Sequence, residues 1–448
     1  MELQTKLSTK TDKKLALLLF TLFFTIFLFS SDGHRATSDE DWAHMQTLKF
    51  VTLQPHPLFE PGVSKQFYEH PTMYPPEASW MQNAKLCNHP LLCTASSIGL
   101  SITQYPFVFI NYHLQLLTPE SVIWTLDDFQ DGHYVSWRNS IDPNFTFLEI
   151  FFGPFYMALS VSIFYLICRT YNYKNKTSLI LTFILGLSTT FWAFSQTSLS
   201  SVPAIFFIIL GFYFFRKFEV QHSAFYLLLS ASSLGFGFVI RNDLILFLAP
   251  LFCIFLIKLF QEKQKIIKLF SFISPLLVFY FIWKYFSSLS YISSQNNELY
   301  TLTRPLLIQY SQSIFHEGIL GILFSPGVGL FIFSPILLTV FFSFPDFFKK
   351  NKTHVIFFIS ISFIYVFYFG TLDHWHGLVT WGARYLLPLI PFMLIPLGMS
   401  IEKRNNKPLY LIILFLSASG FLFNFVYLIQ DVTWFVWGKA GHPVDYMV

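Results

Sequence analysis

Uninterrupted apolar runs recur along most of this chain of 448 residues. Each is about 17–25 residues long, which is the length that a helix needs to cross a bilayer. Hydrophobic residues make up 54% of the sequence and charged residues only 12%, a balance that soluble domains rarely show. The sequence therefore predicts an all-α polytopic membrane protein of the cell inner or plasma membrane.

About eleven spans are expected from these runs. We place them at 15–30, 146–168, 178–195, 198–215, 223–240, 244–260, 267–285, 320–343, 354–371, 385–401 and 408–428. The first run resembles a signal peptide, but no small-residue cleavage site follows it, which favours an uncleaved span. Within the following polar stretch, 98–117 is only partly apolar and contains Gln104 and Pro106, so an interfacial or re-entrant helix is expected there.

Most of the 29 Lys and Arg residues fall in alternate loops between these spans, at 6–14, 169–176, 216–217, 258–268, 349–352 and 403–407. By the positive-inside rule, these loops face the cytoplasm. Such spacing fits membrane orientation better than nucleic-acid binding, so no nucleic-acid partner is expected. Four parts follow: the N-terminus and first span (1–30), a long extracytoplasmic loop with interfacial helices (31–145), a multi-span domain (146–428) and an extracytoplasmic tail (429–448).

An acidic cluster follows the first span directly. Positions 32–41 hold Asp32, Asp39, Glu40 and Asp41, four of the 25 acidic residues of the chain. One interpretation is helix capping, because Ser38 precedes Asp41 by three residues and acids suit a first helical turn. The other is a functional site, because carboxylates at a membrane exit can act as a general base or hold a metal.

The same external face collects the other unusual polar residues. Arg241 and Arg384 lie directly against apolar spans, and His374 and His376 lie in a loop just before Arg384. The arginines could bind an anion through their planar guanidinium groups, or simply extend to the membrane interface. Polar groups that converge at one membrane face indicate a site there, although solvated loops would show a similar pattern.

Cysteine is less informative. Cys87 and Cys93 flank His89 in the long loop, where a disulfide, two plain thiols or a metal site can be considered. The spacing does not match a metal-ligand pattern, so the first two interpretations are favoured and no metal ligand is assigned.

Three motifs in order resemble one enzyme superfamily. They are the first span followed by Asp39-Glu40, Ser-Pro-Gly-Val-Gly-Leu at 325–330, and Trp-Gly-Ala-Arg-Tyr-Leu-Leu-Pro at 381–388. Together they resemble the polyprenol-phosphate-sugar-dependent glycosyltransferases of the GT-C fold, which include protein O-mannosyltransferases and aminoarabinose transferases, and in particular an uncharacterised prokaryotic branch. The resemblance covers nearly the whole chain.

This resemblance implies an inverting transfer of sugar from a polyprenyl-phosphate donor to a lipid, glycan or protein acceptor at the extracytoplasmic face. It implies that Asp39 is the catalytic carboxylate with Glu40 in support, and Asp32 is the second candidate. Arg384 and Arg241 are the candidates for the donor phosphate, since arginine can form two charge-assisted hydrogen bonds to it.

Candidates for substrate binding are His374, His376 and Tyr385. No cofactor is required by these residues, although a divalent cation at the acidic cluster stays open. Two other functions are weighed. A transporter or flippase should place ionisable residues near the middle of spans and often shows internal repeats; a non-catalytic envelope assembly factor would not need the acidic cluster.

Overall fold

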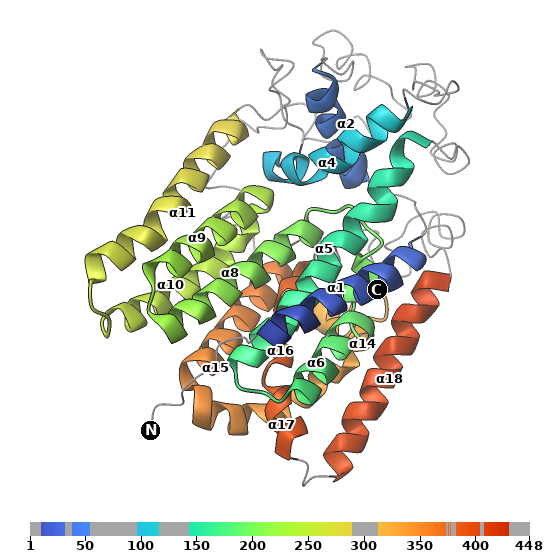
Figure 1. The fold of residues 1–448 in the computed structure, drawn as a ribbon. Coiled ribbons are helices and arrows are strands. Elements are labelled where there is room, and N and C mark those ends of the chain that lie inside the picture. The colour runs from blue at the N-terminus through green and yellow to red at the C-terminus, as the bar shows by residue number, and fades with distance from the viewer. Residues whose placement is uncertain are drawn as a thin grey trace.

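The computed structural model describes residues 10–31, 38–53, 96–115, 143–288, 312–372, 375, 377, 382–403 and 407–429, and within them the regular structure is helical with no strand (Figure 1). The helices of the first half are α1 (Lys10–Phe29), α2 (Ser38–Thr52), α4 (Ile98–Gln115), α5 (Pro143–Thr170), α6 (Asn175–Leu187), α7 (Phe191–Phe194), α8 (Ser201–Gln221) and α9 (Ala224–Ile240). Those of the second half are η4 (Asn242–Leu244), α10 (Ile245–Leu259), α11 (Lys265–Ser288), α13 (Gln312–Phe324), α14 (Leu330–Phe333), η5 (Pro335–Thr339), α15 (Val340–Gly370), η6 (Arg384–Leu389), α16 (Ile390–Leu394), α17 (Leu397–Lys403) and α18 (Lys407–Ile429).

Among the described residues, 7 helical segments are long and apolar enough to cross a membrane. They are Ile150–Thr170, Ser201–Gln221, Asn242–Leu259, Lys265–Ser288, Pro335–Gly370, Arg384–Lys403 and Lys407–Ile429. Each overlaps a span expected from the sequence. The chain therefore has the helices of an integral membrane protein, as predicted.

The other expected spans differ from simple crossings. Helix α1 is 20 residues long but begins with several charged residues. Helix α9 has 17 residues, which is the lower limit of the length that crosses a bilayer. The expected span 178–195 is divided into α6 and the short α7, and 320–343 is divided into α13, α14 and η5. The second division has a sequence cause, because two prolines and two glycines lie between 326 and 335 and interrupt helical hydrogen bonding. The count of eleven spans stays a prediction.

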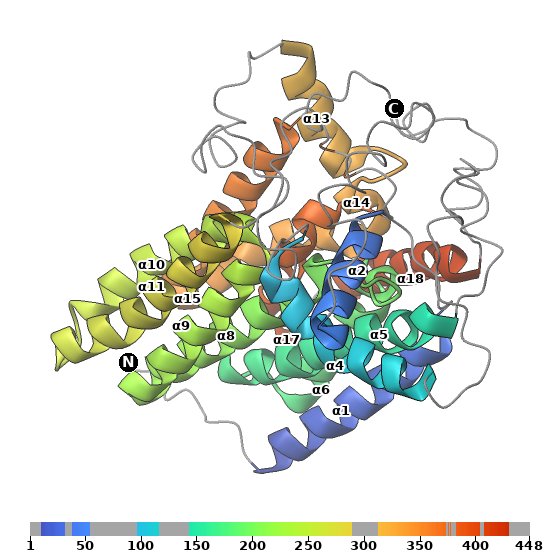
Figure 2. The same cartoon turned by 90° about the horizontal axis from the view of Figure 1, so that it is seen from above.

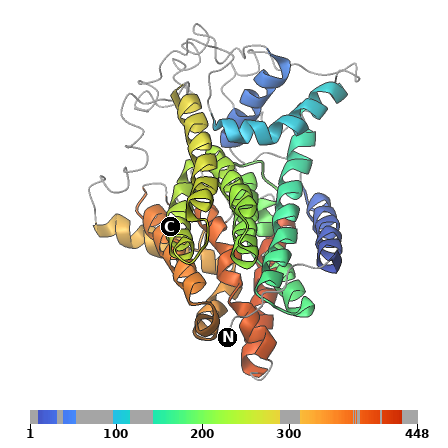
Figure 3. The ribbon, with the colours of Figure 1, turned by 60° about the vertical axis from the view of Figure 1, so that its left-hand side comes forward.

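A core of interlocked aromatic rings joins the helices. Phe212 of α8 packs against Phe357 of α15, with ring centroids 5.8 Å apart, and against Phe392 of α16 at 5.0 Å. Helix α1 lies along the outside of α5 (Figure 3). By contrast, α11 and α18 expose large apolar side chains such as Phe270 and Phe415. Faces this apolar suit hydrocarbon rather than water.

Helices α2 and α4 lie together at one end of the bundle, and seen from above they cover the ends of α5 and α8 (Figures 1 and 2). The expected helix over 98–117 is present as α4, and α2 begins at Ser38, where the helix-capping interpretation of the acidic cluster placed a first turn. The rest of the expected external loop and the tail from 430 lie outside the described residues, and so do Asp32, His374, His376, Cys87 and Cys93.

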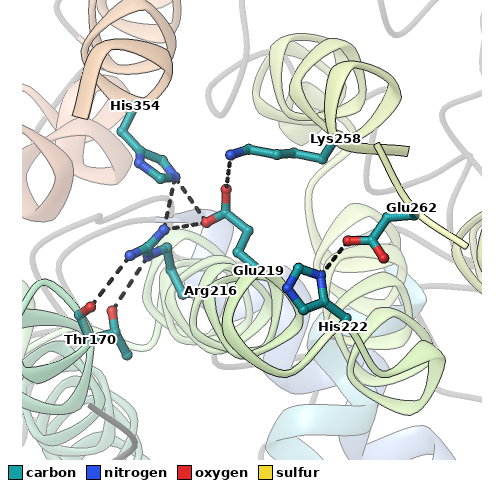
Figure 4. A network of polar contacts seen from close by, with 7 residues as sticks. All are labelled: Thr170, Arg216, Glu219, His222, Lys258, Glu262 and His354. Atoms are coloured by element: carbon teal, nitrogen blue, oxygen red, sulfur yellow. Dashed lines mark hydrogen bonds and ion pairs between the residues drawn. The ribbon is translucent and has the colours of Figure 1, made fainter. Parts of the chain in front are cut away.

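The opposite end of the bundle carries a network of ion pairs (Figure 4). The Glu219 carboxylate lies at its centre: it accepts a hydrogen bond from Arg216, lies 3.0 Å from His354 Nε2, and is 3.6 Å from Lys258 Nζ. Arg216 also reaches the Thr170 carbonyl at 3.4 Å. Four helices, α5, α8, α10 and α15, therefore meet at the end that the positive-inside rule assigns to the cytoplasm.

Cysteine labelling tests this orientation. Leu53 at the end of α2 is 76% exposed, and Lys265 at the start of α11 is exposed at the other end. In a background with the four native cysteines replaced by serine, Leu53→Cys should react with a membrane-impermeant thiol reagent on intact cells. Lys265→Cys should react only after the membrane is opened. The reverse pattern would place α2 and its acidic residues in the cytoplasm.

Candidate functional site

Arg241 marks the point where α9 stops. Its backbone is extended (φ −142°, ψ 114°), while its N–H still donates to the Gly237 carbonyl at 2.9 Å. The chain then enters the short helix η4, which brings Asp243 back toward the Arg241 side chain. Arg241 therefore lies at the junction of two apolar helices, as the sequence suggested.

Asp243 holds the Arg241 guanidinium through a pair of parallel hydrogen bonds. Arg241 Nε lies 2.9 Å from Asp243 Oδ1, and Nη2 lies 2.6 Å from Oδ2. The two side chains are only 15% and 12% exposed. Bidentate pairs of this kind fix orientation as well as adding energy, so the plane of the Arg241 guanidinium is set by Asp243.

The Tyr385 ring brings the two candidate arginines together. The guanidinium carbon of Arg384 lies 5.0 Å from the ring centroid, and that of Arg241 lies 5.9 Å from it. Arg384 Nη2 also lies 3.3 Å from the Tyr385 hydroxyl. Phe369 of α15 stacks on the same ring at 4.5 Å and 3°. Three residues singled out from sequence, Arg241, Arg384 and Tyr385, thus form one cluster.

Two glycines allow the chain to approach this cluster closely. Gly377 and Gly382 both have φ of +72°, in the left-handed region that favours glycine. A Cβ on Gly377 would lie 3.1 Å from Arg384 Cγ, and one on Gly382 would lie 2.7 Å from Thr190 Cγ2. The glycine of the 381–388 motif therefore seats Arg384 against α6–α7, which explains its presence two residues before the arginine.

Glu40 belongs to a different part of the same end. Its side chain is fully buried, and its Oε1 accepts a hydrogen bond of 2.8 Å from the Ser198 backbone N–H. Gln104 of α4 donates to the Ser198 carbonyl at 3.3 Å. Helices α2 and α4 therefore bind the backbone N–H and the backbone carbonyl of Ser198, which lies in the loop between α7 and α8. Asp39 lies one residue earlier in α2, but its side chain is outside the described set.

Helix α4 connects this acidic segment to the arginine cluster. Gln46 of α2 donates to Ser101 of α4 at 2.8 Å, which ties the two helices together. At the start of α4, a Cβ on Gly99 would lie 2.6 Å from the Ile240 backbone nitrogen. Because Ile240 immediately precedes Arg241, the α2–α4 pair is seated directly beside the end of α9.

The remaining sequence candidates receive no structural support. Asp32, His374 and His376 fall outside the described residues. Within the described ranges, no group of three His, Cys, Asp or Glu side chains could hold a metal ion. The motif at 325–330 forms a turn just before α14, in which Ser325 Oγ accepts a hydrogen bond from the Gly327 N–H at 3.2 Å.

Sequence reasoning missed three residues of this region. Asp243 is one of them, although an acid two residues after Arg241 in the sequence could have suggested an ion pair between the two. Ser198 acts through its backbone, which no residue type reveals. Tyr365 of α15 lies four residues before Phe369 and packs on its ring at 5.7 Å, but one more tyrosine among 22 carries no signal.

This arrangement can bind an anion close to α2, the helix that contains the buried Glu40 carboxylate. Two guanidinium groups meet at the Tyr385 ring, which favours an anion over a neutral ligand. No family model matches the sequence, and a search of curated proteins finds no match. The chemistry of the site must therefore be argued from its residues.

Substitution of Glu40 should separate its structural role from a chemical one. Glu40→Gln keeps an acceptor for the Ser198 N–H, whereas Glu40→Ala leaves a buried donor without it. Such an orphaned group costs about 1–3 kcal/mol, so the Ala variant should unfold at a clearly lower temperature in detergent than the Gln variant. Equal unfolding temperatures for both variants would show that this hydrogen bond does not hold α2 in place.

Proposed function

We propose that this protein is an integral-membrane glycosyltransferase of the GT-C type. It transfers a sugar from a polyprenyl-phosphate donor to a lipid, glycan or protein acceptor at the extracytoplasmic face, with inversion. The observation that supports this most is the meeting of Arg241 and Arg384 at the Tyr385 ring. These arginines are 143 residues apart in the chain, and a function that needs two cations at one point explains why they meet.

The two arginines suit a lipid-linked phosphate. As the sugar is transferred, negative charge develops on the departing phosphate, and fixed cations stabilise that charge in the transition state. Guanidinium groups offer paired N–H donors that match phosphate oxygens. Both arginines lie at the ends of apolar helices, where a lipid phosphate could bind while its chain stays in the bilayer.

The acidic segment supplies the acceptor side of the reaction. A hydroxyl acceptor must lose its proton as it attacks the anomeric carbon, and a carboxylate can take that proton. We assign this role to Asp39, in the first turn of α2. The buried bond from Glu40 to Ser198 supports Asp39 by fixing the backbone next to it. Asp32 is the second candidate base, and His374 and His376 are candidates for acceptor contacts.

A transporter or flippase fits the distribution of polar groups less well. Such proteins place substrate and ion sites near the middle of the bilayer. In the described residues, the ion pairs lie at the two ends of the bundle, at Arg241–Asp243 and around Glu219. An enzyme that works at the membrane surface needs charges at one end, so the enzyme is the stronger proposal.

Arg384→Lys tests phosphate binding. Lysine keeps the positive charge but loses the planar fork, so we expect a higher KM for the donor lipid with little change in protein yield. The matched control is Arg169→Lys at the opposite end, where Arg169 Nε pairs with Asp12 Oδ1 at 2.9 Å. That variant should keep the wild-type donor KM. If Arg384→Lys and Arg384→Ala also keep it, then Arg384 is only an interfacial anchor.

Asp39→Asn tests the catalytic base. Asparagine caps helices about as well as aspartate, so the protein should accumulate and fold normally. Transfer of sugar by the purified variant should fall by roughly a hundredfold or more, as is typical when an acid–base group is lost. Asp41→Asn, with the same change of charge two residues on, should retain most activity. Near-normal transfer by Asp39→Asn would instead direct attention to Asp32.

A further inference from the structure

The Tyr365 hydroxyl is a buried polar group that the fold does not use. Tyr365 is among the largest fully buried side chains, and its hydroxyl forms no hydrogen bond with any described residue. Burying a hydroxyl without a partner costs about 1–3 kcal/mol by mutational measures. Phenylalanine would fill the same space without that cost, so a tyrosine here calls for another explanation.

The surroundings of Tyr365 point to the arginine cluster. Its ring packs against Phe369, which in turn stacks on Tyr385, the ring over which Arg241 and Arg384 lie. Arg241 is within electrostatic range of both Tyr385 and Tyr365. Tyr365 lies five residues before the end of α15 at Gly370. At a rise of 1.5 Å per residue, its backbone is about 7.5 Å from that end along the helix axis.

Arg241 itself has donors to spare. A guanidinium group has five N–H donors, and Asp243 accepts only from Nε and Nη2. The residues that the structure describes provide no other hydrogen-bond acceptor for this side chain. A ligand beside Arg241 would therefore meet spare guanidinium donors together with the Tyr365 hydroxyl, which can donate as well as accept a hydrogen bond. An anion with several oxygens matches such a set.

We propose that the Tyr365 hydroxyl donates a hydrogen bond to the phosphate of the lipid-linked donor and, with Arg241 and Arg384, completes its binding site. This inference rests on the proposed function and extends it to a residue of α15. Asp243 takes part as a positioning residue, because it orients Arg241 and neutralises one of the two arginine charges. The hydroxyl adds a hydrogen-bond donor without adding a positive charge. It therefore strengthens phosphate binding less than a third cation would, so that the phosphate can still dissociate after the transfer.

The test uses farnesyl phosphate, a short polyprenyl monophosphate, and measures its Kd for the purified full-length protein by calorimetry. Tyr365→Phe removes only the hydroxyl. A hydrogen bond to a charged group contributes about 1.5–3 kcal/mol, so the Kd should rise roughly 10- to 100-fold. Because the lost hydroxyl has no partner among the described residues, the unfolding temperature without ligand should stay the same or rise.

Tyr171→Phe is the matched control. Tyr171 is also a buried tyrosine whose hydroxyl forms no hydrogen bond with a described residue, but it lies beside Arg216 at the opposite end of the bundle. This variant should bind farnesyl phosphate like the wild type. Inorganic phosphate and farnesol are measured in parallel, and both should bind far more weakly than farnesyl phosphate.

The outcomes distinguish the role of Tyr365 from the proposed function of the protein. If Tyr365→Phe binds farnesyl phosphate like the wild type while Arg384→Lys binds it more weakly, the role of Tyr365 is refuted and the proposed function stands. A lower unfolding temperature without ligand would show a structural role and also refute it. If the wild type does not bind farnesyl phosphate, both proposals fall. Equal affinity for inorganic phosphate would refute the lipid assignment.

Discussion

The structure depends on one constraint: inside a bilayer every backbone N–H and C=O must find its partner within the protein. Where the helices break, polar side chains meet this need. The Thr190 N–H, after the break in α6, lies 3.2 Å from Ser334 Oγ, and Asn424 of α18 donates to the Phe333 carbonyl at 3.0 Å. At Ser198, Glu40 and Gln104 do the same for the N–H and the carbonyl. Backbone groups at the helix breaks are therefore hydrogen-bonded to side chains of other segments.

These joints gather at one end of the bundle, and so does the candidate site. Gly382 seats the 381–388 segment against Thr190 and Phe333, and Arg384 follows two residues later. The first helix is fixed to the same region, because Trp192 and Gln196 both donate to Ser30 Oγ at 3.1 Å. Interrupted helices expose backbone and side-chain polarity that continuous helices hide, so the end of the bundle that contains the breaks is also the end able to bind a polar ligand.

The opposite end has a different character. Around Glu219, each carboxylate oxygen faces a cation, Arg216 or Lys258, and the two oxygens of Glu262 contact His222 and Lys268. Breaking such a buried pair is costly, because it leaves an uncompensated charge. This network fixes α8, α10 and α15 relative to one another. It joins these helices at the end opposite Arg241 and Arg384.

The sequence by itself determined the class of protein, the main membrane helices and the position of Arg241 and Arg384 at helix ends, because apolar length and charges at span ends are local properties. It did not reveal that 178–195 is interrupted at Ser188–Thr190, where there is no proline or glycine. A tertiary hydrogen bond, in which the Thr190 N–H donates to Ser334 Oγ, stabilises that break. Only the tertiary structure decided that the two arginines share one ring, that Asp243 orients one of them, and that the buried Tyr365 packs on Phe369, which stacks on that ring. Contacts between residues more than 100 positions apart depend on how helices pack, and packing is not encoded in any single stretch of sequence.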